Sequence, residues 1–269
     1  MGATDTIADV SAPLHRFVEH VMGIPVSLAL RGRHADDDAG RAAWAAVMAE
    51  LAEVDRVFST YRTDSVVSRL GRGEVELDDC PAEVGEVLAL ARRAEQESGG
   101  AFSVRLPDPA DPTRTRLDPS GVVKGWAADH AARHLAALED TDFCLSTGGD
   151  VVCRSAGEPW RIGVEDPHDP SRVIAVVPLR RGAVATSGTA HRGAHLVDGR
   201  TGLPPEDLAS VTVIGPSLTW ADIDATAAYA MGRRAATWLQ SRPIDSAVVV
   251  ASDGRTTVIA RISSSTEAR

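Results

Sequence analysis

The chain has 269 residues, which suits one large domain or two small ones and is long enough to bury a sizeable core. Apolar residues make up 43% and charged residues 25%, the balance of an ordinary soluble protein rather than of a disordered chain. The net charge is −10, and the sequence has no basic cluster that could follow a phosphate backbone, so we expect no nucleic-acid partner.

The cysteines and the first residues bear on the compartment. Cys80, Cys144 and Cys153 are odd in number, and their spacing fits neither a zinc site nor a disulfide framework, which indicates a reducing environment. The sequence begins without a basic and apolar leader and has no run of about 18 apolar residues, so we expect neither a secretory signal nor a membrane span. A cytoplasmic location is therefore expected.

The first half of the sequence combines one strand with three helices. Apolar residues recur every three or four positions between Trp44 and Phe58, and Pro81 opens a second amphipathic stretch that a Ser-Gly-Gly sequence ends. We expect residues 1–12 to be disordered and 13–269 to form a single domain. The expected elements are a strand over 23–32, a helix capped within 34–40 and reaching 58, a helix over 81–97, a Pro- and Asp-rich loop over 106–121 and a helix over 122–139.

The second half has the pattern of a β-meander. Short β-branched runs are separated by turn residues, one long helix over 220–239 interrupts them, and Asp253-Gly254 is typical of a two-residue hairpin turn. Helices early and strands late predict an α+β fold, a single domain with a largely antiparallel sheet and packed helices. The strands are expected within 143–147, 160–164, 173–179, 183–188, 195–198, 210–215 and 247–260.

Two oxygen-bearing side chains share one face of the otherwise apolar helix. Asp222 and Thr226 lie at positions i and i+4, so their side chains stand one turn apart on the same face. A carboxylate and a hydroxyl at that spacing can ligate one hard cation, with water or phosphate oxygens completing the octahedron. On the spacing alone, a helix cap at Asp222 and a hydroxyl at Thr226 that bonds back to a carbonyl are the simpler interpretation.

A second segment places small and charged residues where a loop turns into a helix. Asp118, Gly121 and Lys124 lie there, and a helix N-terminus with a glycine and a lysine can hold phosphate. The segment does not match the P-loop pattern. A capped helix with an exposed lysine explains the same residues.

Two glycine-containing segments follow. In 145–152 a Gly-Gly-Asp turn joins two strands, and its glycines either let a ligand approach the backbone or simply close a hairpin. In 184–202 small hydroxyl residues and two histidines, His191 and His195, indicate a ligand-facing loop, although a histidine in such a loop is often structural. This segment lacks the G-x-S-x-G elbow of a serine hydrolase and the third ligand of a zinc site.

Eight short motifs occur in order along the chain: STYRTDSVVSRL, GGAF, DPSGVVKGWAAD, STGGDVV, WRIGVEDP, ATSG, HLVDGRTG and ADIDATAAYAMG. Together they resemble the successive motifs of the ApbE-type FAD:protein FMN transferases (flavin transferases). The resemblance runs from about Met22 to Gly232, and the Lys-Gly and A-D-x-x-A-T blocks are its most specific parts.

The resemblance implies a T-fold-like protein that binds FAD and Mg²⁺. It implies transfer of FMN from FAD to a threonine hydroxyl of an acceptor flavoprotein, with release of AMP. Some members of the family instead hydrolyse FAD to FMN and AMP. The expected partners are therefore FAD and an acceptor flavoprotein bearing a target threonine, and Mn²⁺ would suit the same oxygen ligands as Mg²⁺.

The resemblance also implies roles for individual residues. It makes Asp222 and Thr226 metal ligands, together with backbone oxygens at or near Gly121 and Ala225. A base must accept the threonine proton, and either Asp222 or His195 could serve. The expected FAD contacts are Met22, Tyr61, Ala101, Phe102, Ser103, Asp118, Lys124, Leu196 and Val197.

Several features depart from the family pattern. Ser103 stands where the family has an aspartate that contacts FAD, and Gly71 replaces an asparagine. Gly199 replaces a proline and is expected to loosen its turn. The stretch between Phe102 and Asp118 is short for the family, so part of a lid over the site is expected to be trimmed. Many members are exported, whereas this sequence shows neither an export signal nor a lipid-anchoring cysteine near its start.

Two other functions fit the same residues. An FAD pyrophosphatase would use the same site with water as the nucleophile and would need no acceptor protein. A non-catalytic flavin-binding protein would keep the FAD contacts but could dispense with metal ligands, so the presence of Asp222 and Thr226 argues against it. An acceptor assay separates the transferase from the pyrophosphatase.

Overall fold

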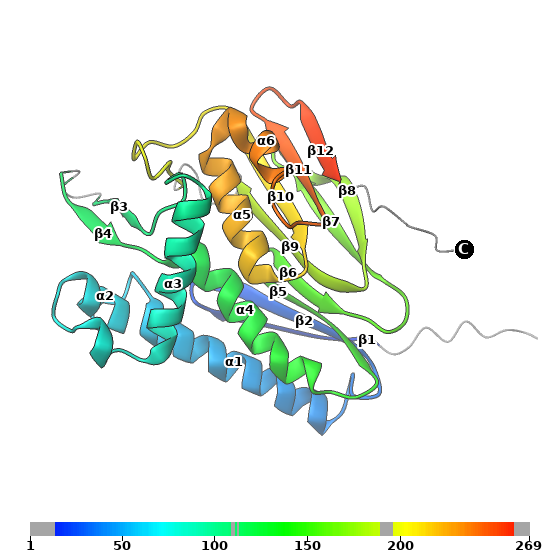
Figure 1. Cartoon of the computed structure of the whole chain (residues 1–269). Coiled ribbons are helices and arrows are strands. Elements are labelled where there is room, and N and C mark those ends of the chain that lie inside the picture. The colour runs from blue at the N-terminus through cyan, green and yellow to red at the C-terminus, as the bar shows by residue number, and fades with distance from the viewer. Residues whose placement is uncertain (1–13, 109–110, 112, 189–195, 261–269) are drawn as a thin grey trace, which may run out of the picture.

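A large antiparallel sheet with helices packed over one face forms the body of the protein (Figure 1). The structure, a computed structural model, describes residues 14–108, 111, 113–188 and 196–260. The sheet has eight strands in the order β1-β2-β5-β6-β9-β10-β11-β12, and every neighbouring pair is antiparallel. The α+β class with a largely antiparallel sheet is thus confirmed.

Alternation of side chains explains how the sheet holds a core on its helical face. In β5, Phe143 and Leu145 are buried beneath the helices, while Cys144 and Ser146 point to the opposite face. The strands of the sheet are β1 (Leu14–Val21), β2 (Ile24–Gly32), β5 (Thr141–Thr147), β6 (Asp150–Arg154), β9 (Arg181–Gly188), β10 (Leu208–Gly215), β11 (Ser246–Ala251) and β12 (Thr256–Ala260).

Three helices lie side by side over the sheet: α1 (Asp38–Phe58), α4 (Ser120–Ala136) and α5 (Leu218–Ala230) (Figure 1). Helix α5 is apolar almost all round because it is enclosed by β9 and β10 below and by α4 beside it. Helix α3 (Ala82–Glu97) packs against α4 and α5. The short helical segments are α2 (Val66–Gly71), η1 (Leu77–Asp79), η2 (Gly232–Arg234) and α6 (Ala235–Leu239).

The opposite face of the sheet carries a hairpin of β7 (Trp160–Asp166) and β8 (Asp169–Leu179). Arg31 of β2 links the start of β7 to the main sheet. Its guanidinium stacks over the Trp160 ring at 4.2 Å and pairs with Asp142 of β5 at 3.0 Å. A second hairpin, β3 (Arg105–Pro107) with β4 (Thr115–Leu117), lies beside α2. Within the residues that the structure describes, no helix is long and apolar enough to cross a membrane.

The sequence located most elements, and three of its predictions were wrong. The Pro- and Asp-rich stretch predicted to be a loop contains the β3–β4 hairpin. The helix predicted over 220–239 breaks after α5, because Gly232 adopts a φ of +59° and starts a separate short turn. Residues 196–198, predicted as part of a strand, form a loop.

Two smaller differences concern hairpin turns and an unpredicted strand. The β11–β12 connection is longer than two residues, since Ala251 N–H donates to the Arg255 carbonyl across Ser252–Gly254. Strand β1 was not predicted at all. The three cysteines are free thiols.

Candidate functional site

The site lies where α4 and α5 cross, and glycines set the distance between the two helices. A Cβ at Gly125 would lie 2.6 Å from the Leu218 carbonyl oxygen and 2.9 Å from Asp222 Cβ. A Cβ at Gly121, one turn earlier, would lie 3.1 Å from the Phe102 ring and 3.6 Å from the Thr226 methyl. The missing side chains therefore allow the metal-ligand candidates of α5 to lie against the backbone of α4.

The start of α5 is held by a side chain from α4. The Asp129 carboxylate accepts hydrogen bonds from the Leu218 N–H at 3.0 Å and from the Thr219 N–H at 2.8 Å. Ser217, the local cap, accepts from the Trp220 N–H. The predicted cap at Asp222 is thus not needed: this residue lies inside the helix with a carboxylate that is free to face α4.

Asp222 is a buried carboxylate with two polar neighbours. One oxygen accepts from the Gly125 N–H at 3.0 Å, and the other lies 3.4 Å from Lys124 Nζ. Burial raises the pKa of Asp222 above its usual range, Lys124 opposes this, and the nearby Asp150 carboxylate adds to it. A carboxylate in such surroundings is stabilised by any further cation that reaches it.

Asp150 is a charged residue of the site that sequence reasoning missed. It follows the Gly148-Gly149 turn, is 2% exposed, and places Oδ2 only 2.5 Å from Lys124 Nζ. Its Oδ1 accepts the Thr186 N–H at 2.9 Å. The motif STGGDVV contained the available signal, a carboxylate directly after a turn rich in glycine, but only the tertiary structure shows that it faces α4.

Thr226 lies one turn along α5 from Asp222, as predicted. Its hydroxyl is 3.1 Å from the Ser187 hydroxyl at the end of β9. Ala225, whose backbone oxygen was expected to contribute, is fully buried beside it. Ser187 adds a further oxygen to the site that the sequence did not assign.

The donor atoms at this crossing fit a hard divalent cation. Asp222 supplies a carboxylate, Thr226 and Ser187 supply hydroxyls, and the buried Thr147 hydroxyl at the adjoining end of β5 has no hydrogen-bond partner. Among the described residues no group of three or more His, Cys, Asp or Glu side chains could hold a metal ion. A cation here would therefore need backbone or ligand oxygens as well, as Mg²⁺ in phosphate sites commonly does.

The loop that follows α3 forms one wall of the site. Ala101 and Phe102 are buried, with the Phe102 ring against Gly121, while Ser103 is half-buried. The Ala101 carbonyl accepts from the Gly199 N–H at 2.9 Å. These contacts place the predicted FAD-contacting loop beside the predicted metal ligands.

Gly199, which was expected to loosen its turn, lies where there is no room for a side chain. A Cβ at this position would lie 2.7 Å from the Gly100 carbonyl oxygen and 2.7 Å from Ser103 Cβ. Proline would also lack the N–H that Gly199 donates to Ala101. Ser103 and Gly199, two of the departures from the family pattern, are therefore in contact. A third departure, Gly71, packs against Leu117.

The remaining predicted FAD contacts differ in how exposed they are. Asp118 is buried, accepts from the Ser120 N–H and pairs with Arg116 at 3.0 Å. Met22 adopts a φ of +56° in the β1–β2 turn, next to the Gly-Gly turn that precedes Asp150. Tyr61 is 97% exposed, so its ring is open to a planar ligand.

The loop of 196–203 completes the site on the side of Gly199. Leu196 is half-buried against the core around α5, and Val197 is half-buried beside it. His195, one of the two candidate bases, lies outside the described residues. The structure therefore brings together Asp222, Thr226, Gly121, Lys124 and Phe102.

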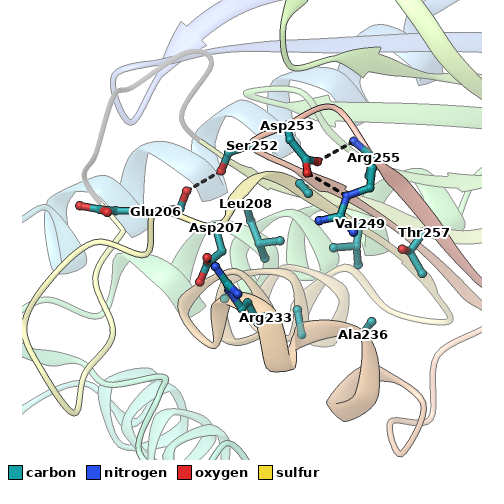
Figure 2. A pocket seen from close by; sticks show the side chains of 13 residues that line it. Glu206, Asp207, Leu208, Arg233, Ala236, Val249, Ser252, Asp253, Arg255 and Thr257 are labelled. Atoms are coloured by element: carbon teal, nitrogen blue, oxygen red, sulfur yellow. Dashed lines mark hydrogen bonds and ion pairs between the residues drawn. The ribbon is translucent and has the colours of Figure 1, made fainter.

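Two hollows lie away from this crossing. One, of about 550 Å³, lies between β11, β12 and η2 (Figure 2), and four of its charged residues form two ion pairs: Arg233 with Asp207 and Arg255 with Asp253. The other, of about 400 Å³, lies between α1, α3 and α4 around Trp126. Neither contains the predicted site residues.

A buried carboxylate, hydroxyls and an ammonium lie together at this helix crossing, and groups of these kinds suit phosphate and a hard cation. The sequence matches the model of the ApbE family over residues 22–108 and 105–250, and the chain belongs to this family. A FAD:protein FMN transferase of Klebsiella pneumoniae is 27% identical over 249 residues, a match that covers 70% of each chain. One of Escherichia coli K12 is 34% identical over 129 residues, which cover 43% of this chain and 37% of the relative.

Solved structures agree on the fold. The ApbE protein of Thermotoga maritima superposes with a TM-score of 0.79 at 21% identity, covering 93% of this chain and 97% of that one. The flavinyl transferase ApbE of Pseudomonas stutzeri gives a TM-score of 0.76 at 24% identity, covering 92% and 96%. The chain therefore has the fold of the ApbE proteins over nearly its whole length.

Proposed function

We propose that this protein is an Mg²⁺-dependent FAD:protein FMN transferase that attaches FMN to a threonine of an acceptor flavoprotein. Membership of the ApbE family and the names of the relatives support the class of reaction. One observation supports the proposal that the enzyme uses a metal ion. Asp222 and Thr226 of α5 lie against Gly121 and Lys124 of α4 where the two helices cross.

The reaction replaces the phosphoanhydride bond of FAD by a phosphoester bond to threonine. The threonine oxygen forms a bond to the phosphorus of the FMN moiety, the bond from that phosphorus to the bridging oxygen breaks, and AMP leaves with the electron pair. The threonine proton passes to a base, for which Asp222 and His195 are the candidates. When bound, Mg²⁺ would neutralise charge that builds on the phosphoryl oxygens.

The residues of the chain supply binding and orientation. Asp222 and Thr226, with backbone oxygens at or near Gly121 and Ala225, would hold the cation. The Lys124 ammonium would bind phosphate oxygen, which matters in a protein of net charge −10 because the overall field repels FAD. Tyr61, with its exposed ring, would stack on a planar part of FAD.

The test is an assay of flavin transfer. The purified protein is incubated with FAD and MgCl₂, with a small acceptor domain carrying a flavinylation threonine and with its Thr→Val counterpart. Acceptor mass that rises by one FMN, only with the threonine and not with an Asp222→Ala enzyme, is the expected result. Omission of the divalent ion should abolish the labelling.

Other outcomes would point to the alternatives. Free FMN and AMP without acceptor labelling would support an FAD pyrophosphatase, for which water replaces the threonine. FAD that binds but stays intact, equally with Asp222→Ala, would leave a flavin-binding protein.

A further inference from the structure

Lys124 is the only lysine in the sequence, since the other 27 of its 28 basic Lys and Arg residues are arginines. Its ammonium lies between two carboxylates that are each 2% exposed: 2.5 Å from Asp150 Oδ2 and 3.4 Å from Asp222 Oδ1. The lysine side chain itself is 23% exposed. Among the described residues, this ammonium is the cation that pairs with the predicted metal ligand Asp222.

The two carboxylates are held in the same manner. The second oxygen of Asp150 accepts the Thr186 N–H, and the second oxygen of Asp222 accepts the Gly125 N–H. Each carboxylate therefore has one oxygen fixed by the backbone and one oxygen directed at Lys124. The ammonium lies closer to Asp150.

A divalent cation on Asp222 would compete with this ammonium. Both are attracted to the same oxygen, and they repel one another over a few ångströms in a poorly solvated site. Asp150 gives the ammonium a partner that lies outside the predicted ligand set, so Lys124 can leave Asp222 without losing its compensating charge. The compact ammonium fits this exchange, whereas the planar, forked guanidinium of arginine needs a wider space.

We propose that Lys124 is an internal competitor of the metal for Asp222, and that Asp150 is the positioning residue that holds Lys124 aside when the metal binds. The inference rests on the proposed function, because it takes Asp222 as a metal ligand. The proposal adds that the affinity for the metal depends on whether the Lys124 ammonium pairs with Asp150 or with Asp222.

Metal affinity without FAD tests the competition. Mn²⁺ is titrated into the FAD-free protein, and the free ion is followed by electron paramagnetic resonance. Lys124→Met should bind Mn²⁺ at least about tenfold more tightly, because the substitution removes the repulsion between the ammonium and the metal. A tenfold change corresponds to only a modest share of the repulsion between two cations about 4 Å apart at an effective dielectric constant of ~20. Lys124→Arg keeps the charge and should not tighten binding.

Asp150→Asn tests the second carboxylate. It leaves the ammonium with Asp222 alone and should weaken Mn²⁺ binding several-fold. Asp142→Asn is the matched control, because Asp142 is a partly buried carboxylate at the far end of β5 that pairs with Arg31 on the other face of the sheet. It should leave Mn²⁺ affinity unchanged.

A single nuclear magnetic resonance signal provides a test in which Lys124 and Asp150 are left unsubstituted. Protein labelled with lysine carrying ¹³C at Cε gives one lysine cross-peak, which reports only on Lys124. Addition of MgCl₂ should shift this peak in the parent and in Asp142→Asn, and should leave it in place in Asp222→Ala.

The outcomes distinguish a failure of the competition between Lys124 and the metal from a failure of the metal assignment itself. Suppose that Asp222→Ala abolishes Mn²⁺ binding, that Lys124→Met does not tighten it, and that Mg²⁺ does not move the lysine peak. This result would overturn the competition between Lys124 and the metal and would leave the proposed function intact. Mn²⁺ binding in the parent that Asp222→Ala does not weaken would overturn the metal assignment and this inference together.

Discussion

Adding one methyl group at Gly125 should separate the two helices that form the site. In Gly125→Ala the new Cβ would lie 2.6 Å from the backbone oxygen of Leu218 and 2.9 Å from Asp222 Cβ. Ordinary contacts begin at 3.4 Å, so α4 and α5 must move apart by several tenths of an ångström. Because the nearest atom belongs to the backbone, a change of rotamer cannot relieve the contact.

Two opposing terms set the size of this effect. Alanine favours a helix over glycine by about 1 kcal/mol, whereas overpacking of a core costs about 1–3 kcal/mol and more where backbone must move. The difference between these terms is a loss of up to about 2 kcal/mol in the free energy of unfolding of Gly125→Ala, and more if the backbone shift is large. The same shift lengthens the 3.0 Å bond from the Gly125 N–H to Asp222, and flavin transfer should fall roughly 10- to 100-fold.

Gly85 offers the matched control. It is also a helical glycine, in α3, but a Cβ there would have no atom within 4 Å apart from its own helix and chain neighbours. Gly85→Ala should raise the free energy of unfolding by about 0.5–1 kcal/mol and leave transfer unchanged. Urea unfolding and a single-turnover labelling assay measure both quantities; equal stability and equal activity of the two variants would refute the close-crossing argument.

Two further predictions concern charge. Arg242→Met should lower the free energy of unfolding by about 3–5 kcal/mol in urea titrations, because it leaves the buried Asp224 unpaired. Arg255→Met, at an exposed pair, should change it by less than about 1 kcal/mol, and similar losses at both sites would contradict the argument. Burial lowers the pKa of His130 below 6.5, helped by Arg133, so the folded state binds this proton less readily than the unfolded chain. Stability should therefore fall as the pH drops through 6.5, and His130→Asn should flatten that part of the pH profile; an unchanged slope would disprove this assignment.

The sequence was informative where a short local pattern determines the structure. The i, i+4 spacing of Asp222 and Thr226 placed both on one helix face, and the structure directs that face at α4. The cap at Asp37 and the end of α3 at Gly99 were likewise local signals. Such features follow from helix geometry and need no knowledge of the rest of the fold.

The parts that sequence could not predict depend on partners distant in the chain. Strand β1 was not recognised because its packed face carries Glu19, whose carboxylate accepts the indole N–H of Trp44 from α1 at 2.6 Å. No residue of β1 is fully buried, and a polar residue on the face that packs against α1 hides the alternation that marks a strand. Asp150 was missed for a similar reason, since its partner Lys124 is reached only through the packing of β6 under α4.

The helix crossing also bears on when the site forms during folding. The bond between Gly125 and Asp222 joins residues 97 positions apart, and the contact between Ser187 and Thr226 joins residues 39 apart. Closing such loops is slow, because chain entropy is lost before the contacts form. Neither half of the chain contains the site, so FAD or a divalent ion would recognise only the completed fold and would stabilise it by mass action, with little influence on the earlier steps of folding.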